Sequence, residues 1–248
     1  MRKSYCCLEY TICGLKFSLL YQILNVDRYG VMKILALSDT VDERVYSEHL
    51  VKNYGDVDLV VGCGDLPYYY LEYVVTVLNR PVLYIYGNHD DKPQVLADGR
   101  VVHEAEGCDL IEGRVTRELN VLFMGLGGSI RYQPQAIHQY SEGQMRARVR
   151  RMLPRLYLNR VRYGRYVDVI VAHSPPFGIH DGDDPAHTGF RTFLSLMERF
   201  KPQLLLHGHI HEWRRDQVTR SSIGGTQVVG VFPVTVIDYH LPAKSASI

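Results

Sequence analysis

Residues 57–90, VDLVVGCGDLPYYYLEYVVTVLNRPVLYIYGNHD, contain two short apolar runs separated by a longer amphipathic one. Leu59–Val61 and Val82–Tyr86 have the length of buried strands, and Tyr68–Leu78 between them has the length and pattern of a helix. A strand, a helix and a second strand in this order imply a crossover connection, which makes the two strands parallel. The stretch therefore predicts an α/β fold.

The same alternation continues on both sides of this stretch. Before it, Ile34–Leu37 has the pattern of a strand and Val45–Tyr54 that of a helix. After it, residues 141–163 predict a long Arg-rich helix, which Pro154 should kink or divide. The remaining predicted elements are the helix Phe190–Phe200 and the strands Ile111–Glu118, Val121–Met124, Val169–Ala172, Leu204–Leu206, Thr226–Val231 and Val234–Tyr239, the last two in an antiparallel region. We predict one α/β domain in which two sheets pack face to face as a β-sandwich flanked by helices, in four layers of the order α/β/β/α.

The composition is typical of a globular protein with a large core. Hydrophobic residues make up 46% of the 248 residues and charged residues 22%. The formal net charge is +1, so an interaction with nucleic acid would need a local basic patch. The sequence has no run of about 18 apolar residues, which argues against a membrane-spanning helix.

Residues 1–31 differ in pattern from the rest, and we predict that they form an N-terminal extension outside a core domain of residues 32–248. A signal peptide is the alternative, but polar residues interrupt its apolar part and no small-residue cleavage site is evident. Three of the five cysteines lie in this extension, and Cys63 and Cys108 lack the spacing of a zinc site. Isolated reduced thiols indicate a cytoplasmic protein. The sequence leaves the oligomeric state open.

Polar clusters directly follow five of the predicted strands. They are Asp39, Gly64-Asp65, Gly87-Asn88-His89-Asp90, His173 and His207-Gly208-His209-Ile210-His211. Because ligands of parallel sheets bind at the carboxyl ends of the strands, the five clusters should meet at one edge. Taken singly, Asp39 could cap a helix and His173 could be an ordinary core histidine. Together they favour a metal site, and oxygen and imidazole donors without a thiolate suit manganese, iron, zinc or nickel.

The series GD (Gly64-Asp65), GNHD (Gly87–Asp90), His173 and GHxH (Gly208–His211) resembles that of the calcineurin-like metallophosphoesterase family, over about residues 33–240. The resemblance implies a metal-dependent hydrolase of phosphomonoesters or phosphodiesters that uses a hydroxide bridging two divalent metal ions, with manganese preferred. It implies that Asp65 bridges the ions. The other ligands that it implies are Asn88, His173 and His209 at one site and Asp39 and His211 at the other. It also implies that His89 gives a proton to the leaving-group oxygen and that Asp90 orients His89.

The chain departs from that family at the first motif, where Asp39-Thr40-Val41 stands in place of the usual Asp-x-His. Valine has no lone pair to offer a metal, so we expect the first of the two sites to be weak. Asp42 or Glu43 is an alternative ligand for that site.

Two further segments suggest contacts with substrate. The polar loop Asp181–Phe190 should overhang the site, where His187 would either contact substrate phosphate or belong to a solvated turn. Residues 146–165 contain eight arginines and no acidic residue, which suggests either a surface for the phosphate backbone of nucleic acid or a solvated helix face. The alternatives to a hydrolase of small phosphoesters are a nuclease that grips its strand with Arg146–Arg165 and a non-catalytic scaffold of the same fold.

Overall fold

The computed structural model describes residues 30–90, 93–95, 99–211 and 218–241. The predicted N-terminal extension, residues 1–31, therefore lies outside the described residues except for its last two, and the first strand begins at Val31.

The first sheet has five strands, in the order β15-β1-β2-β3-β6. The strands are β15 (Val234–His240), β1 (Val31–Leu37), β2 (Leu59–Gly62), β3 (Val82–Tyr84) and β6 (Asp109–Leu110). β1, β2, β3 and β6 are parallel, with Ile34 opposite Leu59, whereas β15 runs antiparallel to β1. The crossover predicted for residues 57–90 is thus confirmed.

The second sheet has six strands, in the order β13-β14-β12-β11-β8-β7. The strands are β13 (Arg220–Ile223), β14 (Thr226–Gly230), β12 (Leu204–His207), β11 (Val169–Ala172), β8 (Val121–Leu126) and β7 (Val115–Glu118). The four central strands are parallel and the two edge strands antiparallel. Two small ribbons complete the strand set, namely β4 (Gln94–Val95) with β5 (Val101–Val102) and β9 (Ser129–Ile130) with β10 (Gln139–Tyr140).

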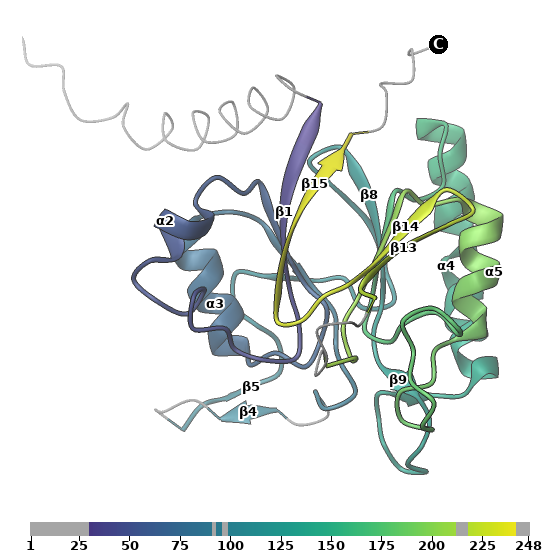
Figure 1. The fold of residues 1–248 in the computed structure, drawn as a ribbon, viewed down its shortest axis with the longest axis horizontal. Helices are drawn as coiled ribbons and strands as arrows, with labels where there is room; N and C mark the ends of the chain where they lie inside the picture. Colours follow the sequence, from purple (N-terminus) through teal and green to yellow (C-terminus); the bar gives the residue numbers. More distant parts are fainter. Residues whose placement is uncertain (1–29, 91–92, 96–98, 212–217, 242–248) are drawn as a thin grey trace, which may run out of the picture.

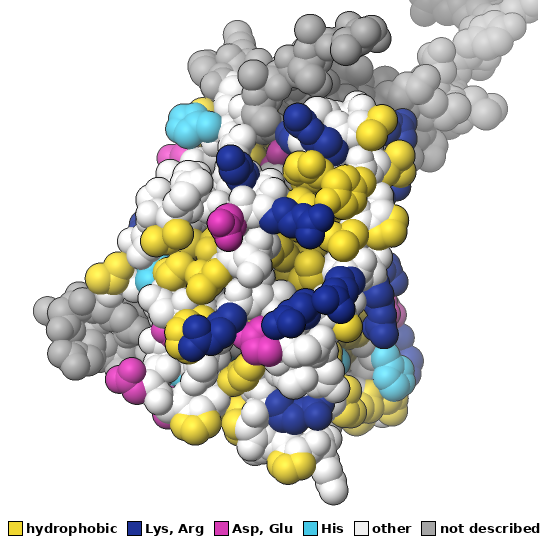
Figure 2. Space-filling view, turned by 90° about the vertical axis from the view of Figure 1, so that its right-hand side faces the viewer, with side chains coloured by type: hydrophobic (Ala, Val, Ile, Leu, Met, Phe, Trp, Pro, Cys, Tyr) yellow, Lys and Arg dark blue, Asp and Glu magenta, His cyan; other side chains and the backbone are white. Residues whose placement is uncertain are grey.

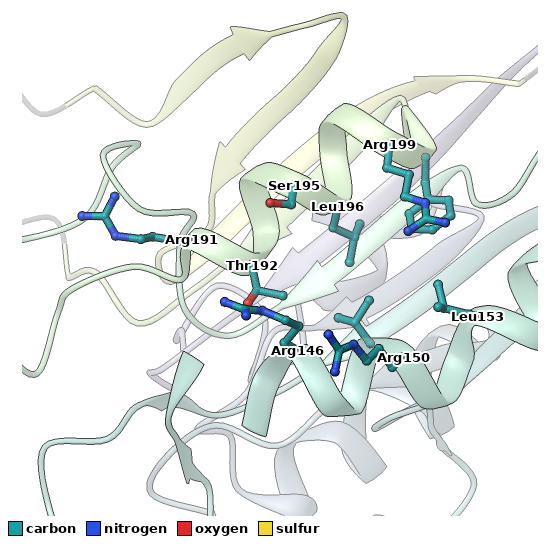
Figure 3. Close-up of a pocket in the computed structure, with 10 residues that line it drawn as sticks. Arg146, Arg150, Leu153, Arg191, Thr192, Ser195, Leu196 and Arg199 are labelled. Carbon is teal, nitrogen blue, oxygen red and sulfur yellow. The ribbon is translucent and has the colours of Figure 1, made fainter. Parts of the chain in front are cut away.

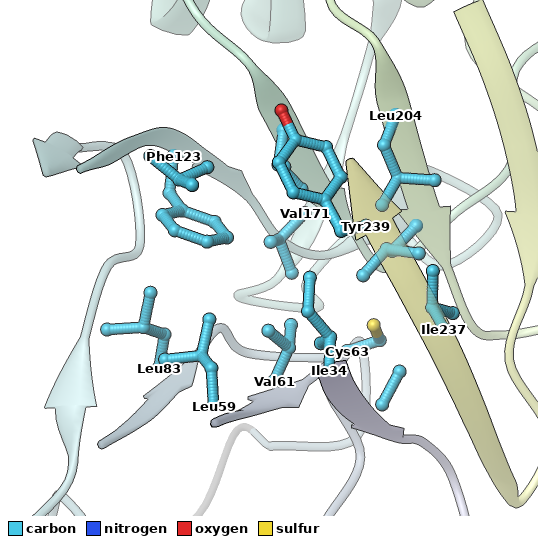
Figure 4. Packing of buried hydrophobic residues seen from close by; sticks show 14 of the residues in the cluster. Ile34, Leu59, Val61, Cys63, Leu83, Phe123, Val171, Leu204, Ile237 and Tyr239 are labelled. Carbon is cyan, nitrogen blue, oxygen red and sulfur yellow. The ribbon is translucent and has the colours of Figure 1, made fainter. Parts of the chain in front are cut away.

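The two sheets pack face to face with helices on both outer sides (Figure 1). Side chains such as Val61 of the first sheet and Phe123 of the second fill the space between them (Figure 4). The helices α2 (Leu50–Tyr54) and α3 (Tyr68–Leu78) cover the first sheet, and α4 (Glu142–Tyr163) and α5 (Arg191–Phe200) cover the second. This is the predicted two-sheet sandwich with layers α/β/β/α. None of the helices in the described residues has the length and hydropathy that crossing a membrane would require.

Three local predictions were wrong. The helix predicted for Val45–Tyr54 is only the short α2, because residues 45–49 form separate turns, in one of which the Leu50 N–H donates to the Ser47 carbonyl oxygen at 3.0 Å. The strand predicted for Ile111–Glu118 is shorter than expected, since only β7 (Val115–Glu118) lies in that range and β6 ends before it at Leu110. Pro154 does not divide α4, which runs unbroken from a capping box at Ser141.

Candidate metal centre

The polar clusters of the sequence lie in loops at the carboxyl ends of β1, β2, β3, β11 and β12. Three of their residues, Asp39, Asp65 and His209, have left-handed backbone conformations, with φ of 66°, 55° and 67°. Such conformations are unfavourable for residues other than glycine and concentrate at functional sites. The backbone of the GHxH motif is therefore not extended at His209.

Two glycines allow these loops to approach one another. A Cβ atom on Gly87 would lie 2.0 Å from Asp65 Oδ1, and one on Gly208 would lie 2.7 Å from Asp39 Oδ2. Both distances are far shorter than a van der Waals contact, so any other residue would displace the carboxylates. The glycines of the GNHD and GHxH motifs are therefore required by close packing between loops.

His173 lies at the centre of the cluster and is fully buried. Its Nε2 atom is 3.2 Å from Asp65 Oδ2 and 2.9 Å from Asn88 Oδ1, and its Nδ1 is 2.8 Å from the Cys63 carbonyl oxygen. The Asn88 amide nitrogen donates to the Tyr132 hydroxyl at 3.2 Å, which turns the amide oxygen toward His173. One ring nitrogen of His173 is thus held by the backbone while the other faces oxygen donors, as in metal-binding histidines.

His209 shows the same arrangement. Its Nε2 atom is 2.7 Å from the Ala186 carbonyl oxygen, which leaves Nδ1 as the nitrogen with a lone pair. Its backbone N–H donates to both oxygens of Asp39, at 3.2 and 3.1 Å. Asp65, His173 and His209 each offer a donor atom within 4.8 Å of the others.

The donor separations fit a divalent metal ion. Atoms bound to one ion at about 2.0–2.2 Å lie about 2.8–3.6 Å from one another in tetrahedral or octahedral arrangements. The distances from His173 Nε2 to Asn88 and Asp65, 2.9 and 3.2 Å, fall in that range. A cation could therefore replace the proton shared by these groups with little movement of the side chains.

Asp39 and His211 form a second group beside the first. His211 Nε2 is 3.5 Å from Asp39 Oδ1, and the His211 ring stacks on Phe232 with centroids 4.9 Å apart. Val41, the residue in place of the family's histidine, packs against the core beneath α2 and α3. The Asp42 carboxylate accepts four hydrogen bonds from Arg44, and Glu43 is exposed. If Asp42 replaced the histidine as a ligand, Arg44 would therefore compete with the metal ion for its carboxylate.

His89 and Asp90 have distinct surroundings. The exposed His89 donates its backbone N–H to Asp65 Oδ1 at 2.8 Å. Asp90 Oδ2 accepts the backbone N–H of Asp65 at 2.9 Å and that of Gly87 at 2.7 Å. Within the part of the chain that the structure describes, no hydrogen bond joins Asp90 to the His89 ring. Both residues line an open cleft of about 300 Å³, with Asp39, Asp65 and His211 and with Leu66, Pro67 and Gln94.

The electrostatics favour a cation at this position. Burial raises the pKa of Asp65, but the nearby His173 more than offsets it and lowers that pKa to about 2. Burial lowers the pKa of His173, whereas the Asp65 and Asp39 carboxylates raise it to about 9. Burial lowers the pKa of His209 to about 4, so its ring is neutral near neutral pH and keeps a lone pair. In the metal-free protein His173 therefore carries the positive charge that a metal ion would supply.

A family model described as calcineurin-like phosphoesterase matches residues 32–213. The chain belongs to this family. Two solved structures are similar to this phosphoesterase family member. One is 15% identical, with a TM-score of 0.60, and the match covers 84% of this chain and 95% of the other. The second is the crystal structure of TT1561 of Thermus thermophilus, 19% identical, with a TM-score of 0.53 and coverage of 81% and 88%. These likenesses concern the fold alone, and no curated protein sequence matches the chain.

His187 and two of the arginines of residues 146–165, which the sequence also indicated, lie near the candidate metal site of this phosphoesterase family member or support the fold around it. The His187 ring is 5.0 Å from that of His209, and its Nδ1 is 2.7 Å from Asp184 Oδ2. Of the eight arginines, Arg148 pairs with Glu112 and donates to the Gly127 carbonyl oxygen at 2.9 Å, so it anchors the loop after β8. Arg165 is 2.7 Å from Asp168 and is likewise structural.

Several supporting contacts have no clear signal in the sequence. Tyr132 lies in a loop without periodicity, and its contact with Asn88 spans 44 residues. Next to the GHxH motif, His207 Nε2 is 3.0 Å from His180 Nδ1, and His180 Nε2 is 2.8 Å from Ser221 Oγ. This chain of contacts joins the GHxH loop to the loop after β11 and to β13. The proximity of His207 to the motif was the only indication of it in the sequence.

Proposed function

We propose that this chain is a metal-dependent hydrolase of small phosphomonoesters or phosphodiesters. The observation that carries the proposal is the convergence of Asp65, His173 and His209, whose donor atoms lie within 4.8 Å of one another. The cleft beside Asp65 is open and is lined mostly by polar side chains, as access by a charged phosphoester requires. The order of the motifs and membership of the phosphoesterase family support the same reaction class.

The proposal assigns the donors to two divalent ions. One ion would be held by Asn88, His173 and His209, and the other by Asp39 and His211. Asp65 would bind both ions. We propose manganese because carboxylate, amide and imidazole donors suit it, with iron, zinc and nickel as alternatives. Ions bound there would lower the pKa of water toward neutrality and polarise the phosphoryl oxygens.

The side chains around the donors have separate roles in this proposal. His89 is exposed at the cleft and would donate a proton to the leaving-group oxygen. Asp90 would act as a positioning residue, because its carboxylate fixes the backbones of Asp65 and Gly87. His187, whose ring lies beside that of His209, would contact substrate phosphate. We place the activity in the cytoplasm, where free thiols such as Cys63 and Cys108 persist.

The test is a hydrolysis panel with added manganese and a chelator control. Its substrates are a nitrophenyl monoester, a bis-nitrophenyl diester, cyclic nucleotides and single-stranded DNA. We expect Asp65→Ala to abolish turnover and reduce bound metal, whereas Asp238→Ala, an exposed aspartate on β15, should leave both unchanged. Turnover of DNA alone would favour the nuclease. Wild-type protein that binds metal but hydrolyses nothing would favour the scaffold, and unchanged turnover in Asp65→Ala would refute the assigned site.

A further inference from the structure

A groove of about 300 Å³ lies between α4 and α5, on the outer face of the second sheet (Figure 3). Its lining includes four arginines, Arg146 and Arg150 from α4 and Arg191 and Arg199 from α5. None of these residues lines the cleft of the metal centre. The groove is therefore a separate feature of the molecule.

The floor of the groove is apolar. Val149 and Leu153 of α4 face Leu196 and Phe200 of α5 across it. Leu153 is half-buried, whereas the other three side chains are buried in the core beneath the two helices. Figure 2 shows the face that carries these helices, where Lys and Arg side chains surround hydrophobic ones. An apolar floor between basic helices is the form of a groove that accepts an amphipathic segment.

Charge is concentrated on these two helices. Together α4 and α5 contain nine arginines and two glutamates, a formal net charge of +7. The whole chain has 28 basic and 27 acidic residues, so the other residues have 19 basic and 25 acidic ones and a net charge of −6. An acidic partner would therefore be drawn to the α4–α5 face and repelled elsewhere.

Two of the four arginines are free to meet such a partner. Arg191 lies over the Phe177 ring, 3.5 Å from its centroid, and Arg199 donates to the Tyr157 hydroxyl at 2.6 Å. Arg146 and Arg150 are exposed, and among the described residues neither forms an ion pair. They are four residues apart on one helix, so their guanidinium groups project from neighbouring turns.

We propose that the α4–α5 groove binds an acidic amphipathic peptide segment of a partner protein. Apolar side chains of that segment would cover Leu153, the one half-buried apolar residue of the floor. Its carboxylates would pair with Arg146 and Arg150, because a planar guanidinium group can donate two parallel hydrogen bonds to one carboxylate. Single-stranded nucleic acid fits less well, because it needs exposed aromatic rings for base stacking and Phe200 is only 5% exposed. The proposal does not depend on the hydrolytic function.

The test measures binding of fluorescent probes to the full chain by anisotropy. The first probe is a synthetic peptide of about 12 residues with Leu on one helical face and Glu beside it, long enough to span the groove as a helix of about 18 Å. The second has Gln in place of Glu, and the third is an oligothymidylate. We expect the Glu peptide to bind most tightly and the Gln peptide at least about fivefold more weakly.

Two matched charge reversals locate the binding. Arg146→Glu with Arg150→Glu should weaken binding of the Glu peptide about tenfold. Arg151→Glu with Arg155→Glu makes the same charge change on the same helix but outside the groove, and should change the affinity less than about twofold. Circular dichroism would verify that both double variants are folded. Equal losses in the two pairs, tighter binding of oligothymidylate than of the Glu peptide, or no binding of the Glu peptide would each overturn the proposal.

Discussion

The role of Asp90 can be tested by comparing Asp90→Ala with Asp90→Asn. Asp90 Oδ2 accepts the backbone N–H groups of Asp65 and Gly87 at 2.9 and 2.7 Å. Alanine leaves both donors without a partner, at about 1–3 kcal/mol each for buried groups. Because water reaches one side of Asp90, we expect the free energy of unfolding to fall by about 2–4 kcal/mol. Asparagine keeps an oxygen at this position and should lie within about 1 kcal/mol of the parent.

The measurement is urea denaturation of chelator-treated protein, followed by a manganese titration of each variant. Asp90→Ala should bind manganese more weakly, because Asp65 is no longer held in its left-handed conformation, φ 55°. Asp90→Asn should bind it nearly as well as the parent. The positioning role is refuted if asparagine destabilises as much as alanine, or if Asp90→Ala stays within about 0.5 kcal/mol of the parent. Equal losses of turnover in both variants with unchanged stability would instead support a charge that orients His89.

Four further predictions concern catalysis, metal binding, the N-terminal residues and pH. His89→Ala should lower the turnover of substrates with poor leaving groups by about 10²–10⁴-fold without loss of bound metal. Turnover of nitrophenyl esters, which have good leaving groups, should fall less. An equal fall for the two kinds of substrate would argue against proton donation by His89. Val41→His should raise the metal occupancy measured by elemental analysis. It should also lower the free energy of unfolding, because Val41 packs against the core. Two tightly held ions in the unmodified protein would contradict the prediction that the first metal site is weak. Removal of residues 1–31 should leave a folded, active protein, and an insoluble product would show that they belong to the core. Because Asp65 raises the pKa of His173 to about 9, above the ordinary 6.5, the stabilisation that His173 gives the metal-free protein is complete below pH 6.5 and lost as pH rises through 9. A melting temperature that stays constant over that range with chelator would contradict this.

The sandwich and its site were predictable where short-range patterns determine structure. Apolar runs of strand length, such as Leu59–Val61, are buried on both faces, so their pattern survives in any context. Because parallel strands end at one edge, the residues that follow them meet there, and Asp65, His173 and His209 do so. The motif order was sufficient to predict this convergence.

The remaining features depend on contacts between residues far apart in the chain. The sequence does not show which arginines of the Arg-rich run are structural and which are free to bind a ligand. Arg148 is structural because it pairs with Glu112, which lies on another segment of the chain. The Arg44–Asp42 pairing competes with a metal for the carboxylate, and only the folded turn shows it. The left-handed backbone at His209 likewise follows from the packing of Gly208 against Asp39 rather than from any local propensity.

The central claim is that this edge of the sandwich binds divalent metal, and the most direct test is a crystal structure of manganese-soaked protein with anomalous data at the manganese edge. The account predicts a strong anomalous peak about 2.0–2.4 Å from His173 Nε2 and an oxygen of Asn88, with Asp65 and His209 as further ligands. It also predicts a weaker peak about 3.5–4 Å away, beside Asp39 and His211. A map without a peak at His173, in which its Nε2 still shares a proton with Asn88 2.9 Å away, would contradict the account.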